Sequence, residues 1–456
     1  MELTLQPDRP AWTRLFEVTL VLFFVGSVLQ NLYSWLPPWN RLLGAFLVLL
    51  AIHGWSRRRG GIPAEIVLFG AFVAWGTLTG FLFARDQRLV LTYVRLLSQE
   101  LALLFAVAEY VTERRAPTFA FLLLLVVPLC LWWYAYGTGE LAAVQGGGKY
   151  SRLQSLSDNP NTVGTLCAYG LFGVGCFLWN RKKQGLVLWP LLVLPFIGPM
   201  LLASASRKSI LAVGIFALAW ASLAYGRGKV SKLRPALLLL MIAAALFLVG
   251  RFVVESTSVG ERFRQAAATP HLDVARYNLY QDGWMMFRQE PVYGVGLGNF
   301  VVHSRGGEYA HSDFMEVLAT TGVVGLVLYF SIYLALWFRL RRVLKKRSDA
   351  TSRYMIGLYQ AMIITTLFIG LGTPNFLNVL YLYIVGMIVG HTRAMEQELR
   401  SIRPAESGTT KDVTSSLPVA VRRAAWSSSQ AWEPPVGSAQ HGSLRRSPRS
   451  AGDDPR

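Results

Sequence analysis

Three short segments near the middle of the chain set its plan. Residues 273–291 read DVARYNLYQDGWMMFRQEP, residues 294–300 read GVGLGNF, and residues 311–316 read HSDFME. They belong to a polar stretch that begins near residue 255, and apolar runs occupy almost all of the chain before and after it. A long polar insertion held at a membrane surface by many helices is where we expect the chemistry of this protein.

The composition is that of a membrane protein. Of 456 residues, 53% are hydrophobic and only 16% are charged, against about 25% charged residues in soluble domains. Runs of about 18–22 apolar residues recur, which is enough to cross a bilayer as a helix. The net charge of +19 could suggest nucleic acid as a partner. We exclude it, because the basic residues lie in short clusters between apolar runs and form no basic domain with interleaved aromatic residues.

The pattern predicts an all-α, polytopic membrane protein with about twelve transmembrane helices. Each span must be helical, because no other single segment satisfies its own backbone in lipid. The expected spans are 14–35, 39–56, 64–83, 90–111, 117–136, 161–179, 186–203, 208–225, 234–254, 313–338, 353–371 and 376–393. Together they predict a transmembrane domain at residues 1–395. Residues 396–456 are rich in Ser, Pro, Gly and Arg and are predicted to be a disordered basic tail.

The distribution of Lys and Arg predicts the orientation. Most of the 45 basic residues fall in one set of connections, which includes the clusters at 57–59, 181–183 and 339–353 and the tail. The positive-inside rule places this set and both termini in the cytoplasm. The loop 255–312 is then extracytoplasmic. Cytoplasmic nucleotide-sugars and ATP cannot reach it, so any activated donor must be carried by the membrane.

Ser206 and Arg207 begin the eighth predicted span on the extracytoplasmic side. Ser206 can cap that helix, which places Arg207 in its first turn, where the helix dipole disfavours a cation. A cation in this position indicates that an anion binds nearby. The alternative is an interfacial arginine that reaches toward lipid phosphate, and the spacing alone leaves both interpretations open.

An amphipathic helix is predicted from residue 273 to 290. Arg276, Tyr280, Trp284 and Phe287 recur at intervals of three and four residues, so one aromatic face carries the arginine. Such a helix can lie on the bilayer surface. A lipid diphosphate would be found at the same depth, so the two interpretations are compatible.

His311 directly precedes the tenth predicted span. Ser312 or Asp313 can cap that helix, and Glu316 completes a box-like pattern if Asp313 is the cap. A helix N-terminus disfavours imidazolium, so we expect a neutral His311 that is suited to act as a general base. The alternative is an ordinary polar histidine of a loop.

Three further features of the sequence can be considered as functional sites. Two of them are explained by local structure, and the third stays a functional candidate. Residues 294–300 follow no predicted strand and have the wrong glycine spacing for nucleotide binding, so a tight turn is expected. Asn159 before Pro160 is a common helix entry. Glu100 is an expensive charge inside the fourth span and a functional candidate by default, with Arg95 as its candidate partner.

Together these segments resemble the O-antigen ligase and O-antigen polymerase superfamily over about residues 15–395. Singly each motif is weak, but together they are fairly specific. Four features match the family in order, namely the Asn-Pro-Asn entry at 159–161, the Ser-Arg turn at 206–207, the arginine-bearing loop helix that leads into the turn at 291–300, and the His-Ser-x-aromatic motif at 311–314 followed by Leu318 and Gly322.

The resemblance implies a GT-C-like, inverting glycosyltransferase of the bacterial inner membrane that needs no metal and no cofactor. Its donor is a glycan on undecaprenyl diphosphate, and its acceptor is a hydroxyl of a lipid A–core sugar or another envelope glycan. Arg207 and Arg276 match the arginines that hold the donor diphosphate, and His311 matches the base. The supporting candidates are Asn159, Ser206, Tyr280, Ser312 and Glu316. The predicted outer loops contain no Asp-x-Asp pair, which is consistent with a reaction without metal.

Three alternatives stay open. The first is a repeat-unit polymerase of the same superfamily, because the short interval from Phe300 to His311 weakens any choice between acceptors. The second is a transporter of lipid-linked oligosaccharide, which should show internal repeats and broken helices; the sequence shows no clear halves. The third is a structural envelope protein, which would not need Arg207, Arg276 and His311 together.

Overall fold

The structure of the chain is a computed structural model. It describes residues 11–32, 39–58, 61–115, 117–146, 153, 160–180, 185–225, 264, 274–347 and 349–402. The ninth predicted span, Asn159 and the tail beyond residue 402 lie outside the described residues. The chain divides into two units, Met1–Glu398 and Leu399–Arg456, and the helix bundle belongs to the first.

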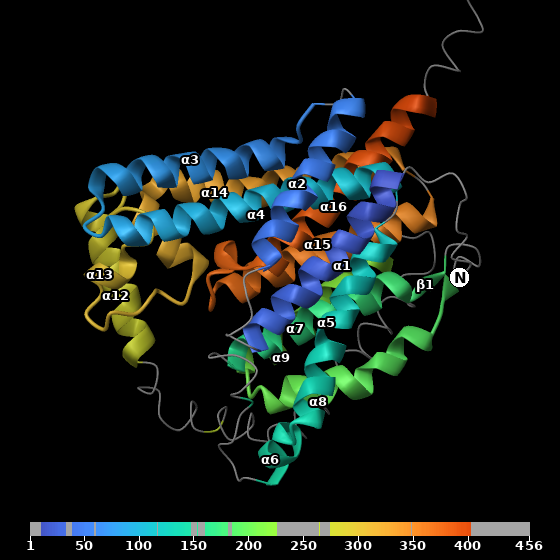
Figure 1. The fold of residues 1–456 in the computed structure, drawn as a ribbon, viewed down its shortest axis with the longest axis horizontal. Helices are drawn as coiled ribbons and strands as arrows, with labels where there is room; N and C mark the ends of the chain where they lie inside the picture. Colours follow the sequence, from blue (N-terminus) through green and yellow to red (C-terminus); the bar gives the residue numbers. More distant parts are fainter. Residues whose placement is uncertain are drawn as a thin grey trace, which may run out of the picture. The chain divides into compact units, whose positions relative to one another are not determined.

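The described part is helical, apart from one two-residue strand pair, so the predicted all-α class is confirmed (Figure 1). The strands β1 (Trp179–Asn180) and β2 (Gly185–Leu186) pair antiparallel. The helices are α1 (Ala11–Leu32), α2 (Trp39–Arg58), α3 (Ala64–Phe83), α4 (Gln87–Arg114), α5 (Thr118–Gly137), α6 (Glu140–Gly146), α7 (Pro160–Phe177), η1 (Trp189–Val193), α8 (Leu194–Ala203), α9 (Arg207–Tyr225), α12 (Val274–Gln289), α13 (Phe300–His303), α14 (Asp313–Lys346), α15 (Ala350–Gly370), η3 (Asn375–Leu377) and α16 (Val379–Ile402).

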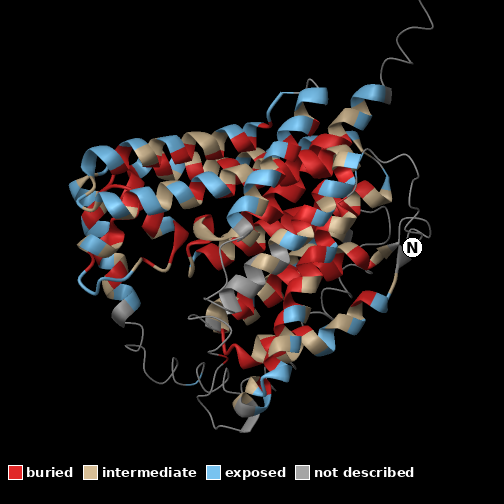
Figure 2. Ribbon diagram, in the orientation of Figure 1, coloured by how far each residue is buried: buried red, intermediate tan, exposed pale blue. Residues whose placement is uncertain are grey.

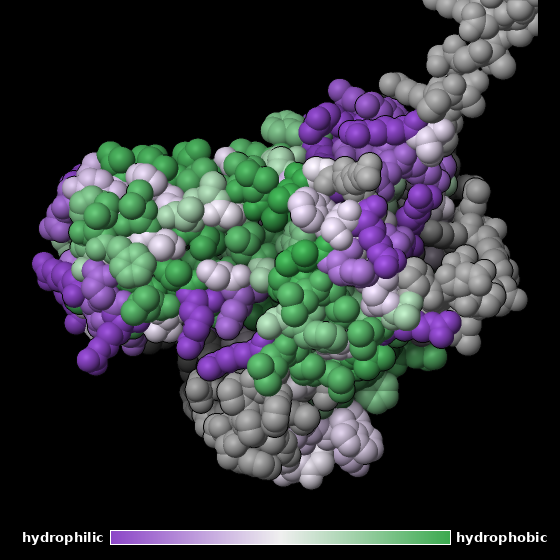
Figure 3. Space-filling view, turned by 45° about the horizontal axis from the view of Figure 1, so that its top comes forward, coloured by the Kyte–Doolittle hydropathy of each residue, from purple (hydrophilic) through white to green (hydrophobic). Residues whose placement is uncertain are grey.

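Five of the described helices are long and apolar enough to cross a membrane. They are α3, α4, α5, α9 and α14. Large apolar side chains such as Val67, Leu91 and Val327 are exposed along them. Figure 3 shows one face of the molecule, on which apolar residues cover a broad area and polar residues gather at its margins. Exposure of this kind fits a lipid environment, so the chain is a multi-pass membrane protein. The number of twelve spans stays a prediction.

Predicted and observed helices agree best where charged or turn-forming residues bound the apolar run. The span expected at 64–83 is α3, with the same limits. The segment expected as one helix at 186–203 is instead η1 followed by the ten-residue α8. Pro190 and Pro195 begin these two helices, and Pro199 lies inside the second. Proline lacks the N–H that a continuous helix needs, which explains the interruption.

Long helices pack side by side to form the core. α14 packs along α3, α9 along α15, and α5 along α7. Figure 2 shows buried residues concentrated within this bundle, with exposed positions on the flanks of α3 and α4. Tyr110, Tyr169, Tyr329, Tyr359 and Tyr381 are among its largest fully buried side chains. Ring contacts such as that of Tyr359 in α15 with Phe121 in α5 join helices across this core.

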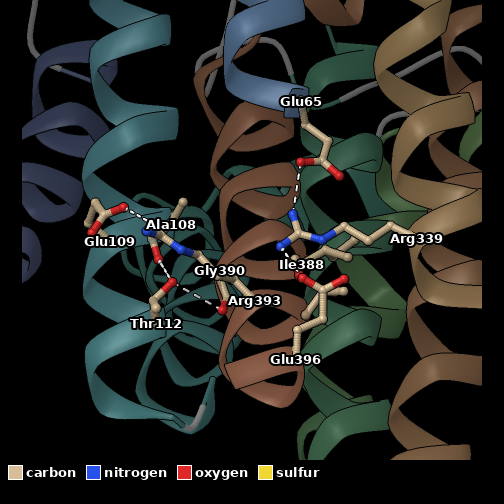
Figure 4. A network of polar contacts seen from close by, with 10 residues as sticks. Glu65, Ala108, Glu109, Thr112, Arg339, Ile388, Gly390, Arg393 and Glu396 are labelled. Carbon is tan, nitrogen blue, oxygen red and sulfur yellow. Dashed lines mark hydrogen bonds and ion pairs between the residues drawn. The ribbon is translucent and has the colours of Figure 1, made fainter. Parts of the chain in front are cut away.

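Buried ion pairs join the helices at one end of the bundle (Figure 4). Arg339 of α14 pairs with Glu65 at 2.9 Å and with Glu396 at 2.8 Å. Arg393 of α16 pairs with Glu109 of α4. We call these residues the ion-pair layer. The turn between α3 and α4 at residues 84–86 and the break of α14 at Gly322 lie at the other end, which we call the site end.

Gly322 interrupts α14 near the site end. Its backbone is non-helical, with φ 66° and ψ −169°, a region essentially restricted to glycine. The glycine-rich turn docks on this break: the amides of Val295 and Gly296 donate to the carbonyls of Ala319 and Thr320 at 2.9 and 3.0 Å. The amide of Val323 donates to the carbonyl of Pro291 at 2.9 Å. The freed backbone groups are thus satisfied within the protein, as an apolar environment requires.

Candidate functional site

The site end is where the elements with predicted functional residues meet. α12 packs against α14, and α9 packs against α15. The turn at residues 371–376, between α15 and α16, contacts three of them: it accepts hydrogen bonds from Tyr280 of α12 and Lys208 of α9, and donates one to Asp313 of α14. We call this segment the central turn.

His311 lies at the entrance to α14 in a left-handed backbone conformation, with φ 54°. Its ring is half-buried beside the ring of Tyr309, with the two centroids 4.1 Å apart. Its Nε2 atom lies 3.8 Å from the Glu308 carboxylate, and 26% of the His311 side chain is exposed. Partial exposure leaves the imidazole accessible to a substrate hydroxyl.

The electrostatic environment favours a neutral His311. Burial lowers the pKa of His311, and the positive charges of Arg276 and Lys208 lower the pKa further. Glu308 opposes them and raises the pKa. The predicted direction is therefore found, and the causes are burial and two nearby cations. A neutral imidazole can accept a proton, as a general base must.

The residues after His311 support the head of α14, although the expected capping box is not formed. Ser312 occupies the N-cap position without a side-chain cap hydrogen bond. Asp313 is turned inward, where it accepts from the hydroxyl of Tyr329 at 3.1 Å. Glu316 reaches back instead and accepts from the amide of Ala310 at 2.7 Å. The carboxylate of Glu316 thereby fixes the segment that carries His311.

The amphipathic helix predicted at 273–290 is α12, and its aromatic face is the outward one. Arg276 is exposed on it, one turn before Tyr280, whose hydroxyl donates to the carbonyl of Leu371 at 3.2 Å. Trp284 is 45% exposed on the same face. The buried face, with Leu279 and others, packs on the glycine-rich turn. α12 is thus tied to the central turn, and Arg276 comes within electrostatic range of His311.

The Ser-Arg turn forms the start of α9 as predicted. Ser206 caps the helix: its hydroxyl accepts from the amide of Ser209 at 3.4 Å and shares a hydrogen bond with the Ser209 hydroxyl at 2.9 Å. Arg207 is the first residue of α9 and is partly exposed. Gly164 of α7 makes room for this turn, because a Cβ there would lie 2.7 Å from the Ser204 and Ser209 hydroxyls.

Two charged residues at the site end have contacts that the sequence did not predict, although Asp313 was a candidate helix cap. Lys208 donates to the carbonyl of Gly372 at 3.1 Å and also to the hydroxyl of Thr373. Asp313 is fully enclosed and accepts from the amide of Phe376 at 3.3 Å. Lys208 shares with Arg207 the unfavourable position of a cation in the first turn of a helix. This position could have identified Lys208 as a candidate from the sequence. Its contacts could not be predicted, because they involve a turn far away in the sequence.

The segment 294–300 is a turn, as predicted. Gly294, Gly296 and Gly298 have positive φ. A Cβ at Gly294 would lie 2.5 Å from the backbone of Thr320. The Asn299 side chain accepts from the amide of Asp86 at 2.8 Å and donates to the carbonyl of the same residue at 3.1 Å. The turn is therefore a structural clamp between α14 and the 84–86 turn.

Glu100 is buried in α4, at 1% exposure. Both of its carboxylate oxygens lack a hydrogen-bond partner among the described residues, so the suggested pairing with Arg95 is wrong. The charge of Asp313 acts on Glu100, which places Glu100 beneath the site end. Asn159, the remaining supporting candidate, lies outside the described residues.

The fold and the site define a multi-pass membrane protein with a polar, cationic cluster around a histidine at one end of its bundle. A model of the O-antigen ligase family matches residues 191–330. This match covers less than half of the chain and supports its similarity to O-antigen ligases over that segment. No curated protein matches the chain. The matched segment contains Ser206, Arg207, Arg276 and His311.

Proposed function

We propose that the protein is an O-antigen ligase-like glycosyltransferase. It moves a glycan from undecaprenyl diphosphate to the hydroxyl of an acceptor sugar, on a lipid A–core or another envelope glycolipid. The observation that carries the proposal is the convergence of His311 with the cations Arg276 and Lys208 at one end of a membrane bundle. This convergence falls within the segment that matches the family.

His311 is the general base of the proposed reaction. The acceptor hydroxyl gives its proton to the imidazole as its oxygen attacks the anomeric carbon. The bond from that carbon to the diphosphate oxygen breaks, and undecaprenyl diphosphate leaves with the electron pair. Attack from the side opposite the leaving group inverts the anomeric configuration. The partial exposure of His311 gives the acceptor access to the base.

Arg207 and Arg276 stabilise the leaving group. A diphosphate ester is already activated, so the main requirement is to neutralise the charge that develops on the leaving oxygens. Guanidinium groups bind phosphate oxygens through two parallel N–H donors. Two guanidinium groups can therefore neutralise the negative charge that develops on the leaving diphosphate without a metal ion. Tyr280, Ser206 and Glu316 hold the elements that carry these groups, and Ser312 is the N-cap residue of α14.

The reaction takes place on the extracytoplasmic face of the bacterial inner membrane, with both termini in the cytoplasm. The supporting observation is the excess of Lys and Arg in the opposite set of connections. Residues 1–395 form the catalytic domain in this proposal, and residues 396–456 form a basic tail. The donor reaches the site laterally from the bilayer, where its lipid already resides.

A transfer assay tests this function. Purified protein receives an undecaprenyl-diphosphate-linked glycan and either a core glycolipid or a second lipid-linked repeat unit, with and without EDTA. We expect a covalent product in both the presence and the absence of EDTA. One addition to the core glycolipid indicates a ligase, and a ladder of repeat units indicates a polymerase. Movement of the donor across proteoliposomes with no covalent product would replace the proposal with a transporter.

A further inference from the structure

Lys208 lies between α9 and the central turn, with most of its side chain enclosed. Its ammonium donates to the carbonyl of Gly372 at 3.1 Å and to the hydroxyl of Thr373. The stem of the side chain lies against Gly372, where a Cβ would be 2.9 Å from Lys208 Cδ. An ammonium has three N–H donors. Two of them have acceptors among the described residues.

The central turn fixes Lys208 relative to the other site elements. The same turn accepts the hydroxyl hydrogen bond of Tyr280 at 3.2 Å, on the helix that carries Arg276. The backbone amide of Phe376 in this turn donates to the carboxylate of Asp313 at 3.3 Å, and Asp313 lies two residues after His311. The amide nitrogen of the Asn375 side chain donates to the carbonyl of Thr366 at 2.8 Å, which anchors the turn to α15. Lys208 is thus held where α9, α12 and α14 meet.

Two cations are brought together at this junction, beside the acidic groups Asp313 and Glu308. Arg276 and Lys208 repel each other, and both act on His311. Asp313 is the acidic group that acts on Lys208. Like charges that lie close together raise the free energy of the folded protein unless an anion binds between them. Arg207 is the neighbour of Lys208 in the chain and adds a further positive charge at the head of α9.

We propose that Lys208 is a third cationic ligand of the donor's diphosphate, beside Arg207 and Arg276, and that it gives the site its preference for a diphosphate over a monophosphate lipid. This inference rests on the proposed function, because it concerns the same donor. A lysine suits the role, since its compact charge can approach a phosphate oxygen while two of its donors stay on the protein. The central turn positions it, and Lys208 touches the substrate.

The test is lipid binding to detergent-purified full-length protein. Undecaprenyl diphosphate and undecaprenyl monophosphate are the probes, and the measured quantity is the ratio of their dissociation constants. Lys208→Gln removes the charge and keeps donors for Gly372 and Thr373, and Lys208→Met removes both. Lys345→Met is the matched control, an exposed lysine near the far end of α14. Thermal melting verifies that each variant is folded.

We expect wild type and Lys345→Met to favour the diphosphate. Both neutral Lys208 variants should lose about tenfold or more in diphosphate affinity, with a smaller loss for the monophosphate, as expected for a charged hydrogen bond. An unchanged ratio in a folded neutral variant would overturn the role of Lys208. If neither neutral variant folds, labelling of the wild-type Lys208 amine by an amine-reactive reagent decides: undecaprenyl diphosphate should protect it, and equal labelling with and without the diphosphate would overturn the role too. A wild-type protein that binds neither lipid would instead overturn the proposed function itself.

Discussion

His311 and Ala205 have backbones that few non-glycine residues adopt. Their φ values are 54° and 50°, and among the described residues only Arg115 shares this feature outside glycine. Such a conformation costs on the order of 1–3 kcal/mol and persists only when the surroundings enforce it. Ala205 precedes the head of α9, and His311 precedes the head of α14. Both therefore turn the chain into helices that carry site residues.

The charge of Glu308 should set the pH dependence of the rate. The neutral form of His311 is the proposed base, so the rate falls as pH drops through its pKa. Burial and two cations lower that pKa, and Glu308 raises it. In Glu308→Gln the pKa should fall further, and the acid limb of the kcat profile should move to lower pH. A limb that moves to higher pH would contradict the assignment of His311 as the base.

The two arginines should not tolerate lysine. Arg207→Lys and Arg276→Lys replace a planar two-pronged donor with a point charge. We expect each to cost about 2–4 kcal/mol of transition-state stabilisation, measured from kcat/KM for the donor. Arg288→Lys is the matched control, because Arg288 lies over the Trp284 ring on the same helix at 5.7 Å. Equal activity in all three variants would exclude a diphosphate role for Arg207 and Arg276.

Elements bounded by local signals could be predicted from the sequence, and contacts between distant elements could not. α3 ends near Arg85 and α12 ends before Pro291, where charge and proline mark the limits. Arg276 and His311 were predicted from motifs, and the charge of Arg276 acts on His311. Lys208 was missed, because its partners Gly372 and Thr373 come from a turn whose position only the packed bundle defines.

The break at Gly322 was also missed, since apart from Thr320 and Thr321 the residues around Gly322 form one apolar run without proline or charge. We expect Gly322→Ala to destabilise the protein by about 1–3 kcal/mol or more, because its backbone region is essentially restricted to glycine. A Cβ there would also lie 2.2 Å from the carbonyl oxygen of Val292. Thermal melting in detergent measures the effect. Gly306→Ala is the control, because nothing lies within 4 Å of a Cβ at that position. Equal melting temperatures would mean that the break is not a structural requirement.

The whole molecule separates two polar regions along its helices. The ion-pair layer joins α3, α4, α14 and α16 at one end, and the histidine and its cations lie at the site end. The sequence predicted this division from the alternation of basic connections. The site end corresponds to the set with fewer Lys and Arg, which the positive-inside rule assigns to the extracytoplasmic face.

Cysteine labelling tests that orientation. Cys130, Cys167 and Cys176, none of which forms a disulfide, are replaced first. A single cysteine at Gly306, which is exposed near the site, should react with an impermeant thiol reagent in cells with a permeable outer envelope. A cysteine at Arg342, exposed near the ion-pair layer, should react only after lysis. Labelling with the opposite pattern would place the site in the cytoplasm.

The central claim is that His311 removes the acceptor proton during transfer from a lipid diphosphate. The direct measurement is single-turnover glycan transfer by wild type and His311→Ala, with donor affinity and membrane insertion determined on the same preparations. We predict that the rate of transfer falls by roughly 10²–10⁴ in His311→Ala, while donor affinity stays close to that of wild type. Transfer by His311→Ala at the wild-type rate would contradict the role of His311 as the base.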